Sequence, residues 1–170
     1  MLTGGRHDRR SRTAYRRALA LVAASWIALP LPVACAQEGD LFALLAGNWR
    51  GSGTATLFDN RRYHVACDAA YSGTGAKLVV RIDCRSDYSD LRLRANVTRT
   101  VGRLTGLWRE EVLGVAGTIA GISAAERLSL TVFSVVPAHM DVVYAKRRHR
   151  VVITAANVPV VRVEINMRRR

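Results

Sequence analysis

Two cysteines in the middle of the chain have the type and spacing of a disulfide. Between Cys67 and Cys84 lies DAAYSGTGAKLVVRID, in which two strand-like runs flank the turn sequence GTGA. If Gly75 and Ala76 form a two-residue type II′ loop, the hairpin register places Cys67 opposite Cys84 at a non-hydrogen-bonded pair. The Cα atoms of such a pair are about 4.5 Å apart, which is within disulfide range. The sequence therefore predicts a structural disulfide, which stabilises the fold by about 3 kcal/mol.

A redox or metal-binding role for the same cysteines is the alternative. The chain has no CxxC sequence, and no histidine-rich cluster adjoins Cys67 or Cys84. Thiol redox centres and zinc sites use such closely spaced ligands. The sequence therefore favours the structural bridge and indicates no metal site.

The remaining acidic and nucleophilic residues form no recognisable catalytic pattern. Neither a GxSxG elbow nor an HExxH pair is present, and no glycine loop has the spacing that binds phosphate. Glu110 and Glu111 are adjacent on a strand-like run, so their side chains should point to opposite faces instead of facing one another. We therefore expect no catalytic residues and no enzyme activity.

A basic run lies close to the C-terminus. Lys146, Arg147, Arg148 and Arg150 form a candidate basic patch together with the arginines at 168–170. Solvated hairpin tips and strand edges are the simpler interpretation of these charges. Nucleic acid is not an expected partner, because the chain is predicted to be exported and no aromatic residues alternate with the arginines.

The first 36 residues resemble an export signal in composition. They carry six arginines and one aspartate, a net +5 of the chain's total of +13, so the remainder carries +8. The uncharged run at 18–29 is shorter than the roughly 20 residues of a membrane-spanning helix. Small residues precede Gln37, which predicts a signal peptide at 1–36 cleaved after Ala36. We therefore expect a periplasmic or secreted protein without a stable membrane anchor.

A lipid anchor on Cys35 is the alternative localisation. Lipoprotein signals usually have leucine three residues before the lipidated cysteine, whereas this chain has Pro32 there. The sequence therefore favours cleavage after Ala36 over lipidation, and residues 37–170 should form a single domain.

Residues 37–170 read as short strands joined by short turns. In the last of them Val161, Val163, Ile165 and Met167 alternate with polar residues, the period expected of a half-buried strand. Short joins suit antiparallel neighbours, and closure into an up-and-down barrel protects the edges of so many strands. A two-sheet sandwich is the alternative. After a short helical segment, strands are predicted at 48–58, 61–71, 77–85, 88–100, 103–110, 113–122, 127–135, 139–147, 149–156 and 159–168.

The same alternation predicts which large and small residues face the barrel interior. Trp49 begins the first strand, with glycines two and four positions later on the same face. A large ring at one end can close the bottom of a barrel, and inward glycines beside it favour some empty space in the interior. The candidate interior residues are Trp49, Gly51, Gly53, Tyr63, Tyr71 and Trp108.

The first strand and its neighbours resemble a known group of proteins. LLAGNWRGSGT after a short helix is similar to the Gly-x-Trp signature of lipocalin-like (calycin-type) barrels, which include lipocalins, fatty-acid-binding proteins, avidins and nitrobindins. With HVACDAAYS, LRLRANVT and GRLTGLWREE, the arrangement resembles small exported alphaproteobacterial proteins of unknown function. The resemblance implies a secreted lipocalin-like barrel and no particular activity.

Haem binding follows only by analogy with the nitrobindin-like barrels, which use a histidine of a later strand. That analogy points to His139 or His149, but His149 lies in KRRHR, which reads as a charged hairpin tip. Axial ligation requires a histidine that faces an apolar pocket. We therefore expect no cofactor.

The sequence thus predicts an exported, non-enzymatic binding or interaction protein. Its expected partner is a small apolar ligand within the barrel or an anionic component of the cell envelope. A structural or partner-binding barrel with a filled core is the alternative.

Overall fold

The computed structural model describes residues 41–124 and 126–170, so the predicted signal peptide at 1–36 lies outside the described residues. A five-residue helix precedes ten strands. Among the described residues, no helix combines the length and apolarity needed to cross a membrane. The elements are α1 (Leu41–Leu45), β1 (Gly47–Leu57), β2 (Arg62–Thr74), β3 (Lys77–Ser86), β4 (Leu91–Thr100), β5 (Arg103–Glu110), β6 (Val115–Ala124), β7 (Arg127–Phe133), β8 (Ala138–Ala145), β9 (Arg148–Ala155) and β10 (Val160–Arg169).

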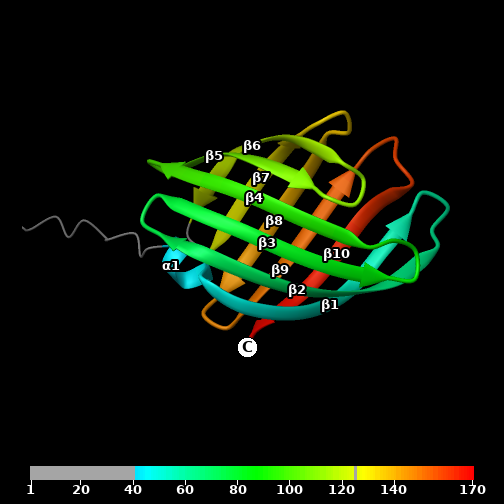
Figure 1. The fold of residues 1–170 in the computed structure, drawn as a ribbon, viewed down its shortest axis with the longest axis horizontal. Coiled ribbons are helices and arrows are strands. Elements are labelled where there is room, and N and C mark those ends of the chain that lie inside the picture. The colour runs from blue at the N-terminus through cyan, green and yellow to red at the C-terminus, as the bar shows by residue number, and fades with distance from the viewer. Residues whose placement is uncertain (1–40, 125) are drawn as a thin grey trace, which may run out of the picture. The chain divides into compact units, whose positions relative to one another are not determined.

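The strands form one closed antiparallel barrel (Figure 1). Each strand pairs with the strands before and after it in the chain, and the seam is closed by β1 pairing with β10. Closure gives every strand two partners and leaves no open sheet edge. The predicted up-and-down barrel is therefore confirmed, and the two-sheet sandwich is wrong.

The β2–β3 hairpin has the register that the turn sequence predicts. Gly75 has a φ of 60°, and Thr74 pairs with Lys77 across the two-residue turn. The ladder then brings Cys67 opposite Cys84, with a Cα separation of 4.1 Å, and the two form a disulfide. The bridge joins the middle of β2 to the last part of β3.

The barrel has two different ends. We call the end that carries α1 and the turn at 75–76 the closed end, and the opposite end, with the loops at 58–61, 87–90, 111–114, 134–137 and 156–159, the open end (Figure 1). At the closed end α1 inserts Phe42, which is 0% exposed, into a cluster with Leu104, Val142 and Tyr144. Within the described residues, no helix covers the open end.

The glycines of β1 serve close packing and do not open space inside the barrel. A Cβ on Gly53 would lie 1.7 Å from the carbonyl oxygen of Glu164, and one on Gly51 would lie 2.3 Å from the sulfur of Met167. Both partners belong to β10, so these glycines let the seam strands approach each other. The expectation of inward space at Gly51 and Gly53 is therefore wrong.

Candidate functional site

Trp49 lies in the packed floor at the closed end. Its ring is 1% exposed, and its Nε1 donates a hydrogen bond to the carbonyl oxygen of Leu45 at 2.8 Å. The guanidinium of Arg169 lies over the same ring, 4.9 Å from a centroid. These contacts join α1, β1 and β10, so Trp49 acts as a structural anchor of this end.

His149 is also part of this floor, which corrects its interpretation as part of a charged hairpin tip. Its side chain is 3% exposed and meets the Trp49 ring edge-on at a centroid distance of 4.4 Å. Because side chains alternate along β9, His149 faces inward while Arg148 and Arg150 face solvent. Sequence reasoning missed this site because the neighbouring charges concealed the alternation.

A hydrogen bond inside the barrel links His149 of β9 to β2, with β10 and β1 between the two strands. The Tyr71 hydroxyl and His149 Nε2 are 3.2 Å apart, whereas His149 Nδ1 is buried without a partner among the described residues. Burial lowers the pKa of His149 to about 4 and raises the pKa of Tyr71 above its ordinary value. Both groups are therefore neutral at pH 7, and a neutral ring nitrogen can accept the tyrosine proton in a hydrogen bond.

The open end has a different lining. Beside buried residues such as Leu57 and Val65, it has a group of inward side chains that are mostly large, apolar and only half-buried. They come from strands all around the barrel. The set is Tyr63, Ile82, Leu91, Leu93, Trp108, Met140, Ile153 and Val163.

Trp108 is the largest member of this lining. Its Nε1 is buried and has no hydrogen-bond partner among the described residues. A Cβ at Gly117 of the neighbouring strand would lie 2.9 Å from this nitrogen, so the glycine makes room for the indole. A buried N–H group without a hydrogen-bond partner destabilises a protein by about 1–3 kcal/mol. A hydrogen bond formed after a small movement of the ring would remove this penalty.

Glu110 is a buried carboxylate at the open end, but its contacts are structural. Its oxygens accept hydrogen bonds from the backbone N–H groups of Arg92 at 2.8 Å and Val112 at 3.0 Å, and from that of Leu113. Burial alone would raise its pKa, but these donors outweigh burial and hold the pKa below its ordinary value. Glu110 therefore fastens the 111–114 loop to β4. Glu111, outside the strand, is exposed.

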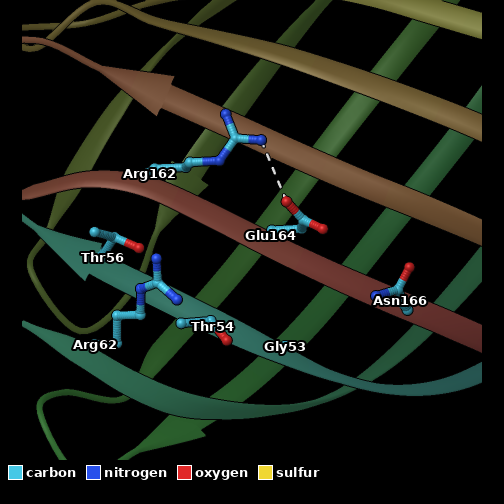
Figure 2. Close-up of a pocket in the computed structure, with 7 residues that line it drawn as sticks. All are labelled: Gly53, Thr54, Thr56, Arg62, Arg162, Glu164 and Asn166. Carbon is cyan, nitrogen blue, oxygen red and sulfur yellow. Dashed lines mark hydrogen bonds and ion pairs between the residues drawn. The ribbon is translucent and has the colours of Figure 1, made fainter.

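Two shallow grooves lie on the outer wall of the barrel, where small side chains of β1 are flanked by longer ones. One, of ≈ 290 Å³, lies above Thr54 and Thr56 between Arg62 and Arg162 (Figure 2). The other, of ≈ 730 Å³, lies above Ser52, and Asn166 lines both. Together they follow the outward face of β1.

The predicted basic patch is at the closed end, on the outside. Lys146 and Arg147 form the turn between β8 and β9, and the backbone N–H of Arg169 donates to the carbonyl oxygen of Arg147. The hairpin and the C-terminal arginines therefore lie side by side. Arg150 pairs with Glu164 at 2.6 Å.

The other histidines face away from the barrel interior. His64 and His139 are exposed on the outer faces of β2 and β8, and His139 contacts Asp141 at 3.4 Å. Within residues 41–124 and 126–170, no cluster of three or more histidine, cysteine or acidic side chains is placed to hold a metal ion.

Comparisons with known proteins identify the fold and no more. Neither a family model nor a curated protein matches the chain. The S-type phycobiliprotein lyase CPES from Guillardia theta superposes with a TM-score of 0.56 at 10% identity, over 76% of this chain and 90% of that protein. Rv2717c from M. tuberculosis superposes with a TM-score of 0.61 at 11% identity, over 75% and 94%. The barrel is therefore lipocalin-like, as the first-strand signature implied.

Proposed function

We propose that this chain is an exported, non-enzymatic binding protein that holds a small apolar ligand within the open end of its barrel. The observation that carries the proposal is the half-buried apolar lining around Trp108, directly inside an end that no described helix covers. Binding sites of this kind combine a mainly apolar lining with a few polar groups that orient the ligand. The unpaired Trp108 N–H is such a group, and it suits a ligand with a hydrogen-bond acceptor.

The loops of the open end add apolar surface around this lining. Phe58, Leu113 and Val135 are 71%, 72% and 88% exposed, and each belongs to a different loop. Exposed apolar side chains gathered at one end of a protein are typical of a ligand entrance or a protein contact. They support binding at this end and leave two occupants to distinguish, a small ligand or a partner protein.

A haem group does not fit the histidines as they are placed. His139 faces outward, and His149 Nδ1 is enclosed while Nε2 contacts the Tyr71 hydroxyl. An axial ligand needs a histidine nitrogen that faces an accessible pocket. Haem added to the purified protein is therefore expected to give no Soret shift.

Native mass spectrometry of the protein recovered from its own periplasm is the primary test. We expect a mature chain that begins at Gln37 and carries a retained apolar small molecule. Trp108→Ala should weaken binding of that molecule by about tenfold or more, because it removes a large contact surface and the N–H donor. Leu107→Ala is the matched control, since Leu107 lies on the same strand but faces solvent.

The alternative barrel with a filled core makes the opposite prediction. If the core is filled, the purified protein should retain no small molecule and should not bind a panel of lipids and tetrapyrroles. It should instead capture a protein through the exposed loops of the open end. That result would reject the ligand-binding proposal.

A further inference from the structure

A row of three arginines crosses the outer wall at the closed end. Arg168 of β10 lies directly opposite Arg148 of β9 on one side and Arg50 of β1 on the other. Directly opposite residues have Cβ atoms about 4.5–5.5 Å apart, and like charges in such pairs repel. We call Arg50, Arg148 and Arg168 the arginine row.

The described residues provide little acidic compensation for this row. Arg50 pairs with Asp68 at 3.0 Å, but Arg170 contacts the same carboxylate oxygen at 2.6 Å. The side chains of Arg148 and Arg168 make no hydrogen bond or ion pair within residues 41–124 and 126–170. Unlike an ordinary set of surface ion pairs, the arginine row therefore has cationic groups available to an anion.

The arginine row borders the larger groove of the outer wall. The lining of this groove includes Arg50, Arg85 and Arg168, the small residues Ser52 and Ala66, and the carboxylates Asp68 and Asp83. Both carboxylates are already paired, Asp68 with Arg50 and Asp83 with Arg94. Through Asn166 this groove continues into the smaller one, so the hollow follows β1 from Arg50 to Thr56. At about 3.3 Å per residue, that path is roughly 20 Å long.

The smaller groove extends the same chemistry. Figure 2 shows Thr54 and Thr56 beside the long side chains of Arg62 and Arg162, with Asn166 farther along β10. Arg162 pairs with Glu164 at 3.2 Å, whereas Arg62 has no side-chain partner within the described residues. The hollow thus has hydroxyl and amide groups along β1 and β10, guanidinium groups beside them, and three carboxylates that are each paired with an arginine, namely Asp68, Asp83 and Glu164.

We infer that this surface binds an acidic polysaccharide chain. A linear polymer fits an elongated hollow better than a flat membrane does, and guanidinium groups form strong charge-assisted hydrogen bonds with carboxylates. The hydroxyl and amide groups of the floor can hydrogen-bond to sugar hydroxyls. Neither groove is lined by an aromatic side chain on which the bases of a single-stranded nucleic acid could stack. The surface is on the outside of the barrel and is independent of the proposed ligand site.

Titration of the full-length protein with polygalacturonate, which has a carboxylate on every sugar, tests the inference. We expect binding that weakens with added salt, and no binding to neutral dextran. The double variant R148Q/R168Q should bind polygalacturonate at least about tenfold more weakly, because two charge-assisted contacts are lost. The matched variant R81Q/R103Q removes the same charge from exposed positions outside the grooves and should stay within about twofold of the parent.

Thermal denaturation separates loss of binding from loss of folding. R148Q/R168Q should melt at the same temperature as the parent or higher, since it removes repulsion between opposite strands. Equal weakening by both double variants would overturn the inference, because it would indicate net charge alone. Binding to single-stranded DNA or to anionic lipid vesicles as tight as to polygalacturonate would also overturn it, as would no binding to polygalacturonate.

Discussion

The two ends of the barrel are built from the same alternating strands but enclose different interiors. At the closed end, Trp49 hydrogen-bonds to Leu45 of α1, and side chains of β1, β2 and β9 meet in ring contacts and a hydrogen bond. At the open end, Trp108 and its apolar neighbours are half-buried, and the Trp108 N–H has no partner among the described residues. The difference is one of burial, because the Trp49 and His149 rings at the closed end are fully enclosed whereas the Trp108 ring at the open end is half-buried.

The turns show the same asymmetry. At the open end, large apolar side chains are exposed on the loops at 58–61, 87–90, 111–114 and 134–137. At the closed end, the described turn residues include one such side chain, Val101, beside the charged turn of Lys146 and Arg147. The loops of the open end are therefore richer in exposed apolar side chains than the described turns of the closed end, as expected if the open end is a contact surface.

The largest expected effect compares the two tryptophans. Trp49→Ala should lower the free energy of unfolding by about 3–5 kcal/mol, because a fully enclosed ring is removed. Trp108→Ala should lower it by about 1–2 kcal/mol, because that ring is half-buried. Chemical denaturation with the disulfide intact measures both. An unchanged stability for Trp49→Ala would reverse the roles of the ends and make the GNWRGSG stretch the first candidate for a binding site.

The second effect is a pH dependence that originates at the closed end. Burial lowers the pKa of His149 from 6.5 to about 4, so below pH 6.5 the unfolded chain takes up a proton that the folded chain does not. Stability is therefore complete above the unfolded value and declines as the pH falls toward 4, by about 3 kcal/mol in total.

Urea denaturation between pH 7 and pH 4 tests this difference. His149→Gln should lose the part of the slope that belongs to His149. His64→Gln should retain it, because His64 is exposed on the outer face of β2. Parallel pH profiles for the parent and His149→Gln would show that His149 is not held neutral in the closed end.

The smallest effect concerns the structural carboxylate of the open end. Glu110→Gln should lower the free energy of unfolding by about 1–2 kcal/mol, because one amide oxygen replaces two carboxylate oxygens that accept three backbone N–H groups. The contribution of Glu110 is present above its unfolded pKa and disappears as the pH falls through its depressed folded pKa. Glu111→Gln, which removes surface pairs with Arg94 and Arg109, should change stability by less than about 0.5 kcal/mol.

Local sequence patterns predict the strands and the hairpin register of this fold. Period-2 alternation and short turns gave strand bounds close to those of the structure, and the strand at 103–110 coincides with β5. The expected alternation is wrong where β10 begins. The register between Thr56 and Leu57 shifts so that Leu57 pairs with Val160, and Val160 packs against the core cluster. A bulge of this kind inserts one residue into the alternation and has no clear sequence signal here.

The contacts of His149 are less predictable because they join strands that are far apart in the sequence. Tyr71 and His149 are separated by 78 positions, and nothing near either residue in the sequence specifies the other. The partners of Glu110 are local by contrast, since they are the backbone groups of Val112 and Leu113 and of Arg92 on the neighbouring strand β4. The prediction for Gly51 and Gly53 is also wrong. Inward glycines can either leave space in the interior or let a neighbouring backbone approach closely, and these two let β10 approach β1.

The β1–β10 seam determines when this protein can fold. Its two strands are the first and last in the barrel, and Gly51 pairs with Met167 across more than a hundred intervening residues. Contacts between such distant parts of a chain form late and slowly, because a long loop must close before they contribute. The β2–β3 hairpin, by contrast, closes locally and can be locked by its disulfide while the rest of the chain is still unpaired. Barrel closure must therefore follow synthesis of β10, so a chain still emerging from the ribosome has no finished core.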